Sequence, residues 1–269
     1  MDMQYRRLLL VTGLLVLAGI GPARAQGTLN ELEQDFGARF SITADKKIVK
    51  GVHLFVEGEA RLKDNFSSLG RYQGTLGFTW KISNYFKVGT GYTFIEKQNS
   101  EGVWKPRHRV YLDGALNLRA GDWRFSVKER LQFTHRDVNN TYQNNPNALA
   151  LKSRFKIAYN GFSRVTPYGY VELRNVFNDP SVKATWSTAS LAYSNYSFGG
   201  YNDIYINRLR ASLGAEWKLS KHHSLDFFVL GDYCYDKNID TDAAGTLLRS
   251  LTYDQSLNVN LGLGYKFSF

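Results

Sequence analysis

The last fourteen residues, 256–269, alternate between apolar and polar side chains almost without fault. The apolar set consists of Leu257, Val259, Leu261, Leu263, Tyr265, Phe267 and Phe269. Because successive side chains of a β-strand point to opposite faces, the segment predicts a strand with one apolar side and one polar side. An exposed apolar strand at the edge of a soluble protein promotes aggregation. A transmembrane β-barrel requires such strands, with the apolar side toward lipid.

The first 25 residues have the features of a secretory signal peptide. Arg6-Arg7 gives a basic start, residues 8–20 form an apolar run too short to span a bilayer, and Ala23-Arg24-Ala25 is a small-x-small cleavage site. We therefore predict a signal peptide over 1–25 and an integral barrel of the cell outer membrane over 26–269.

The composition supports export and restricts the partners. The chain has 17 Phe, 17 Tyr and 5 Trp, and no apolar run after the leader is long enough for a transmembrane helix. The formal net charge is +10, and removal of the leader leaves about +8. After export, the expected partners of a basic protein are lipid phosphates or anionic solutes, and not nucleic acid. The single Cys234 excludes an internal disulfide and any cysteine-based metal cluster, and no cofactor is expected.

Eleven alternating segments follow one another along the chain, which predicts an all-β fold. The class is a transmembrane antiparallel up-and-down β-barrel of about 10–12 strands. Short connections are predicted at 45–47, 83–85, 120–122, 160–165 and 220–224. Longer connections are predicted at 64–70, 98–106, 137–147, 176–203 and 237–249. This asymmetry is typical of short periplasmic turns and longer external loops.

The odd number of segments conflicts with the even strand number of bacterial single-chain barrels. If the last strand ends in the periplasm, the first segment runs inward from outside. Two explanations remain open: a short strand precedes Glu31, or the N-terminal segment passes through the lumen.

The polar faces of the segments carry many long charged side chains, which form a predicted lumen charge network. Its members are Glu57, Glu59, Arg61, Arg107, Arg109, Asp113, Arg124, Arg130, Arg154, Glu172, Arg208, Arg210, Asp232 and Asp236. If the turn at 120–122 sets Arg119 opposite Arg124, then Asp113 lies opposite Arg130. If Lys218 faces Asp226, then Arg208 faces Asp236. Opposite charges across a ladder are mildly stabilising. The network is thus either a salt-bridged filling of a narrow lumen or a path that attracts anions.

Glu129 is an exception to the alternation, because strict alternation points it to lipid between Val127 and Leu131. A carboxylate in the middle of a membrane is costly. We therefore expect a β-bulge near Lys128 that turns Glu129 inward.

Catalytic and metal sites are not indicated. A His and a Ser two residues apart on a strand, with an acidic partner, can serve a membrane-embedded lipid hydrolase, but His222-His223-Ser224 falls in a predicted polar turn. The remaining histidines, His53, His108 and His135, lie on different segments without metal-ligand spacing. Aromatic residues near the short turns, including Trp80, Trp123, Trp217 and Phe269, predict an interfacial girdle.

Four runs of sequence resemble a known family. They are WRFSVKERLQFTHR (123–136), LKSRFKIAYN (151–160), PYGYVEL (167–173) and NRLRASLGAEWKLSKHHSLD (207–226). They are similar to an uncharacterised family of Gram-negative outer-membrane barrels, the domain-of-unknown-function family twenty-four-ninety. The resemblance implies the fold and the location but supplies no catalytic residues. It also implies that Arg130, Arg154, Glu172, Arg208 and Arg210 belong to a recurring pattern.

Three functional hypotheses follow. The first is a structural barrel or a narrow pore for small polar or anionic solutes. The second is a lipid-active or lipid-binding outer-membrane enzyme, and the third is an adhesin acting through its external loops. The expected partners are outer-membrane lipids and the barrel assembly machinery, which would recognise the C-terminal strand through Phe269.

Overall fold

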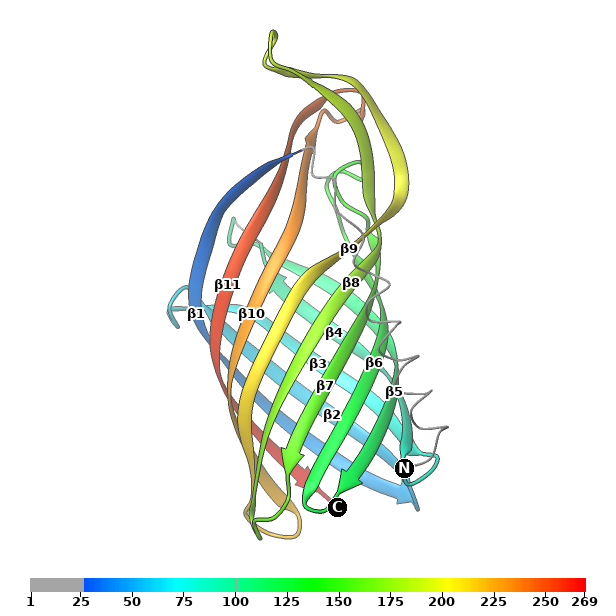
Figure 1. Ribbon diagram of the computed structural model, residues 1–269, viewed down its shortest axis with the longest axis vertical. Helices are drawn as coiled ribbons and strands as arrows, with labels where there is room; N and C mark the ends of the chain where they lie inside the picture. Colours follow the sequence, from blue (N-terminus) through cyan, green and yellow to red (C-terminus); the bar gives the residue numbers. More distant parts are fainter. Residues whose placement is uncertain (1–26, 100) are drawn as a thin grey trace.

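The computed structural model describes residues 27–99 and 101–269, and these residues form one closed barrel of eleven strands (Figure 1). The strands are β1 (Thr28–Val49), β2 (Val52–Lys63), β3 (Ser68–Lys81), β4 (Phe86–Gln98), β5 (Trp104–Ala120), β6 (Trp123–Arg136), β7 (Asn147–Tyr159), β8 (Val165–Ser187), β9 (Ala192–Lys218), β10 (His223–Thr241) and β11 (Leu248–Ser268). The predicted all-β barrel of 10–12 strands is confirmed. The predicted signal peptide lies outside the described residues. Within them, no helix is long and apolar enough to cross a membrane.

The barrel closes through a parallel pair of strands, β1 and β11, while all other neighbours are antiparallel. Phe36 lies opposite Val259 and Ile42 lies opposite Tyr265, so the apolar faces of the two strands coincide along the seam. Both explanations for the odd strand number are therefore wrong for residue 27 onward. The first segment is itself a wall strand, and a parallel pair satisfies both edges of an odd-numbered barrel.

The end of the barrel that holds the C-terminus carries short connections (Figure 1). The turn predicted at 45–47 is wrong, because β1 continues to Val49 and the chain reverses at Lys50 and Gly51. Gly51 has a φ of +83°, a conformation that glycine adopts without strain. Asp45 instead points inward, where it binds the ammonium group of Lys266 at 2.5 Å and Nδ1 of His53 at 2.8 Å.

The opposite end extends well beyond the barrel as a curved ribbon formed by β8 and β9 (Figure 1). The irregular stretch predicted over 176–203 is wrong, because strand pairing continues to Ser187 and Ala192. The loop predicted over 237–249 is likewise shorter, since β10 runs to Thr241 and β11 starts at Leu248. Apolar side chains hold these extensions together and explain the added strand length. They are Val182, Ala184, Tyr193, Tyr196, Ile239, Leu248 and Leu251.

The outer wall is an apolar belt. Ile42 is 66% exposed, Leu112 is 60% exposed and Leu213 is 74% exposed, and all three point away from the lumen. At the rim with the short connections, aromatic rings pack against one another: the ring centres of Trp123 and Tyr159 lie 5.0 Å apart, with their planes tilted by 54°. A belt of this kind has no favourable contact with water, and it matches the hydrocarbon region of a bilayer.

Glu129 remains in this outer wall, so the predicted bulge near Lys128 is wrong. The register of β6 with both neighbours is unbroken and places Glu129 between Gly114 and Ser153. These small residues leave room for the carboxyl group, and the Ser153 hydroxyl donates a hydrogen bond to its Oε2 at 2.6 Å. This hydrogen bond lowers the free-energy cost of placing the carboxyl group on the outer wall, so the strand needs no bulge to turn it inward.

Candidate functional site

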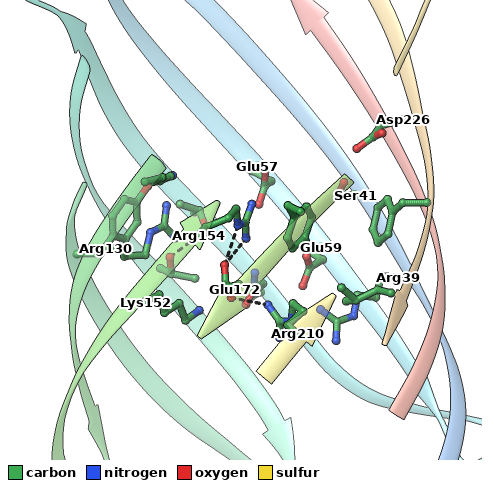
Figure 2. A pocket seen from close by; sticks show the side chains of 18 of the residues that line it. Arg39, Ser41, Glu57, Glu59, Arg130, Lys152, Arg154, Glu172, Arg210 and Asp226 are labelled. Atoms are coloured by element: carbon green, nitrogen blue, oxygen red, sulfur yellow. Dashed lines mark hydrogen bonds and ion pairs between the residues drawn. The ribbon is translucent and has the colours of Figure 1, made fainter. Parts of the chain in front are cut away.

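The interior of the barrel contains a cavity of about 460 Å³ with a predominantly basic lining. Figure 2 shows its charged side chains pointing inward from several strands. Its basic residues are Arg39, Arg61, Arg109, Lys128, Arg130, Lys152, Arg154, Lys156 and Arg210. Its acidic residues are Glu57, Glu59, Glu172 and Asp226. Strict alternation along each strand places all of these side chains in the lumen.

Asp113 is the centre of one ion-pair cluster. As the hairpin arithmetic predicts, it lies opposite Arg130, and Arg119 lies opposite Arg124. Nε and Nη2 of Arg130 donate to the two carboxylate oxygens at 2.6 and 2.8 Å. Nζ of Lys128 lies 2.8 Å from Oδ2, so one carboxylate binds two cations. This bidentate geometry fixes the position of the Arg130 guanidinium group, whose Cζ lies 3.8 Å from the ring centre of Tyr111.

A second cluster crosses the lumen from β7 to β1 through two carboxylates. Glu172 lies between Arg154 and Arg210 (Figure 2), with Nε of Arg154 at 2.8 Å and Nη1 of Arg210 at 3.1 Å. Arg210 also donates to Asp232 at 2.8 Å, and Arg39 of β1 donates to the same carboxylate at 3.2 Å. Glu172 is 3% exposed and Arg210 is 6% exposed. The chain of ion pairs therefore ties five strands together away from bulk water.

The predicted pairing of Arg208 with Asp236 is wrong. The connection between β9 and β10 sets Ser224 opposite Lys218, which shifts the register by two residues from the prediction. Arg208 consequently lies opposite Cys234, and its Nε is 3.4 Å from Asp232. Asp236 accepts a hydrogen bond from Asn207 at 2.8 Å instead.

The other predicted network residues occupy different levels of the lumen. Glu59 pairs with Arg61, and Glu57 accepts a hydrogen bond from Thr43 at 3.2 Å. Arg109 donates to the hydroxyl of Thr134 at 3.0 Å. Arg107 lines a separate pocket of about 230 Å³ below the 137–144 loop. Arg124 lines another pocket, of about 460 Å³, near the short turns. The structure thus places eight of the fourteen predicted residues in the lining of the central cavity. Asp113 and Asp232 bind cations of that lining, while Arg107, Arg124, Arg208 and Asp236 lie outside it.

Several luminal cations are absent from the predicted network. They are Arg39, Arg71, Lys97, Lys152, Lys156 and Arg174. Each of them occupies a polar position in the alternation of its strand, and this position predicts that its side chain points into the lumen. Arg174, for example, follows outward-facing Leu173. Lys156 also lies over a tyrosine ring, with its Nζ 3.6 Å from the ring centre of Tyr168.

The geometry gives little support to a hydrolase. His223 and Ser224 open β10 and are not part of the turn. Nδ1 of His222 lies 2.6 Å from the backbone oxygen of Ser268, and Nδ1 of His223 lies 2.5 Å from the hydroxyl of Tyr265. An apolar groove of about 620 Å³ runs along the outer wall between β7 and β10, but its lining includes neither His nor an acid. In the described residues, no group of three His, Cys, Asp or Glu side chains is arranged to hold a metal ion.

Comparison with known proteins finds a family and several solved structures of low similarity. Residues 36–243 match the model of the family described as Protein of unknown function (DUF2490). A solved structure of outer-membrane expressed OmpT of Vibrio cholerae is 12% identical, with a TM-score of 0.35 over 80% of this chain and 63% of that chain. The siderophore receptor PirA from Pseudomonas aeruginosa is 10% identical, with a TM-score of 0.21 over 80% of this chain and 55% of that chain. The chain therefore spans less than two thirds of either protein. A search of curated proteins finds no match.

Proposed function

We propose that this chain, which belongs to the DUF2490 family of proteins of unknown function, spans the outer membrane as a narrow pore for small anionic solutes. The observation that carries the proposal is the charge around the central cavity. Nine of the lining side chains are Lys or Arg, and four are Asp or Glu. Even when Asp113 and Asp232 are included because they bind lining cations, basic groups outnumber acidic groups by nine to six.

An excess of fixed positive charge in a low-dielectric channel attracts anions and repels cations. Coulomb interactions are also stronger in such a channel than in water, because water screens them less. The ion pairs that cross the lumen restrict its free space, so the pore is expected to exclude large solutes. The solute class is therefore small and anionic.

The location in the outer membrane rests on the outer surface of the barrel. The exposed apolar belt would contact the acyl chains of lipids, and the aromatic pairs at the rim with the short connections would lie at the membrane interface. The terminal residue Phe269 stacks on Phe267 with ring centres 5.1 Å apart, at the end of the closing strand. We propose that the assembly machinery recognises this aromatic strand end.

Conductance of the refolded chain in planar bilayers tests the pore. We expect discrete current steps that shrink in the Lys152→Gln variant and remain unchanged in Arg164→Gln. Arg164 is a suitable control, because it is an exposed residue of the connection between β7 and β8. If refolded, heat-modifiable protein gives no current steps, the lumen is a structural filling and the pore proposal is wrong.

One observation favours a second candidate, adhesion through the external ribbon. Leu191 at the ribbon tip is 74% exposed and Trp186 is 48% exposed, with the Trp186 ring packed against Tyr193 at 4.9 Å. An apolar tip far from the barrel is suited to contact with another surface. Cells that express the Leu191→Ser and Trp186→Ser double variant should lose attachment relative to wild-type cells. Equal attachment at equal surface expression would eliminate this candidate.

A further inference from the structure

Two rows of like charge face each other inside the barrel. On β2 to β4, Arg61 lies opposite Arg71, and Arg71 lies opposite Lys97. On β7 to β9, Lys152 lies opposite Arg174, and Arg174 lies opposite Arg208. Like charges directly opposite each other destabilise a ladder, so these rows are unfavourable by themselves.

The two rows belong to opposite walls of the barrel, because β5 and β6 separate β4 from β7 on one side, and β1, β11 and β10 separate β2 from β9 on the other. Their side chains point inward, so the cations of both rows extend toward the same part of the lumen.

Four of these cations form what we term the unpaired basic band: Arg71, Lys97, Arg109 and Arg174. In residues 27–99 and 101–269, each ion pair within 4.0 Å involves other residues. Arg71 and Arg109 donate only to the neutral groups of Gln73 and Thr134. The Nε atoms of Arg71 and Arg174 are buried and have no hydrogen-bond partner in the same residues.

One member of the band, Arg109, borders the central cavity, and a second hollow lies next to it on β5. Arg109 lines the central cavity, and Arg107, two residues away on the same face of β5, lines the pocket below the 137–144 loop. Solutes that enter from the external side would therefore meet the band before the ion-paired clusters of Asp113 and Glu172. This position is suited to the capture of a solute.

We propose that the unpaired basic band binds a compact multivalent oxyanion of the phosphate class. Buried cations without an ion-pair partner are costly, and one anion with several oxygens supplies acceptors to several of them together. Guanidinium groups bind phosphate oxygens in a bidentate fork, and forks that approach from opposite walls match a tetrahedral anion. A halide ion lacks these directed acceptors, and a neutral sugar lacks the charge.

This inference rests on the proposed function in one respect, because it names the solute class that the pore would select. Binding itself requires no conduction, so the two proposals are tested separately. If the protein conducts anions but does not bind phosphate compounds, the binding site is wrong and the pore stands. If it binds them but does not conduct, the pore is wrong and the site stands.

Isothermal titration of the refolded full chain in detergent micelles, with inorganic phosphate and with pyrophosphate as probes, tests the site. We expect saturable binding of one pyrophosphate per chain, tighter than that of phosphate, and weakened at least tenfold in Arg174→Gln and in Arg109→Gln. Arg174→Lys keeps the charge but removes the bidentate hydrogen bonding of the guanidinium group, and should give an intermediate loss of pyrophosphate affinity. Arg164→Gln should bind as the wild type does.

Three results would overturn the proposal. They are absence of pyrophosphate binding to heat-modifiable wild-type protein, equal affinity of wild type and Arg174→Gln, and an equal loss in Arg164→Gln. The last result would indicate nonspecific attraction by the net charge. Loss of fold does not confound Arg174→Gln, since neutralising one of two facing arginines relieves repulsion and should stabilise the barrel. Arg109 faces Thr93 and Thr134, so heat modifiability of Arg109→Gln is the check that this variant is folded.

Discussion

Arg174 on β8 lies directly opposite Arg208 on β9, whereas the preceding inward position of the same two strands pairs Glu172 with Arg210. One favourable and one unfavourable charge pair thus occupy consecutive levels of the lumen. The unfavourable level faces the external end, where a solute would supply the missing negative charge.

These two levels should respond to mutation with opposite signs. Arg174→Gln removes repulsion and should raise the free energy of unfolding by about 0.5–1 kcal/mol. Arg210→Gln leaves the buried carboxylates of Glu172 and Asp232 with fewer partners and should lower it by about 3–5 kcal/mol. Urea unfolding of the refolded protein in detergent measures both values. Changes of the same sign would show that the luminal charges do not act as this account states.

Glu129 offers a test of the outer wall. Glu129→Leu should raise the free energy of unfolding in lipid by about 1 kcal/mol, because an acidic group facing hydrocarbon is replaced by an apolar one. Ser153→Ala should destabilise the wild type, since it removes the hydrogen bond to the carboxyl group, but should have no effect in the Glu129→Leu background. A destabilised Glu129→Leu protein would mean that this side chain does not face lipid.

Lys237 should determine whether the external ribbon stays in place. Its side chain is 3% exposed, it pairs with Asp203, and its Nζ lies 3.5 Å from Asp179. Lys237→Met would leave both carboxylates without their cation, so the ribbon should loosen. Chymotrypsin should then cleave near Tyr193 at least several times faster than in the wild type. Lys183→Met is the matched control, because Lys183 is exposed on the same ribbon; equal cleavage of both variants would contradict the proposed role.

The C-terminal aromatic should affect assembly more than stability. Phe269→Ser is expected to reduce the amount of protein inserted in the outer membrane several-fold, while refolding in detergent is little changed. Phe162→Ser provides the comparison, since Phe162 is a 59% exposed aromatic in the connection between β7 and β8. Membrane fractions of expressing cells measure the effect. Normal insertion of Phe269→Ser would remove the proposed recognition by the assembly machinery.

The barrel was predictable from the sequence because the residues of each strand by themselves identify that strand. Alternation with a period of two identifies each strand and its lipid-facing side, and it correctly assigned eleven segments. The hairpin between β5 and β6 was also predictable, since a two-residue connection fixes the pairing of Asp113 with Arg130. The connection between β9 and β10 has four residues, and its uncertain length led to the wrong partner for Arg208.

Other features depend on contacts between distant parts of the chain. The parallel pairing of β1 with β11 joins the two ends, and no local pattern encodes it. The β8–β9 ribbon is rich in Ser, Asn and Gly, and it becomes regular because it packs against Ile239, Leu248 and Leu251. Glu129 stays outward because Gly114 and Ser153 on the neighbouring strands make space for it. The sequence likewise does not show that Arg71 and Arg174 lack an ion-pair partner, because this depends on which strands face each other in the closed barrel.

The reversal potential of single channels in a tenfold gradient of KCl tests the central claim most directly. An anion-selective lumen should give a reversal potential with the sign of the chloride equilibrium potential and a magnitude of at most about 59 mV. The double charge reversal Arg109→Glu and Lys152→Glu should move the reversal potential toward the potassium equilibrium potential. A wild-type reversal potential with the sign of the potassium equilibrium potential, or one that the charge reversal leaves unchanged, would contradict an interior that selects anions.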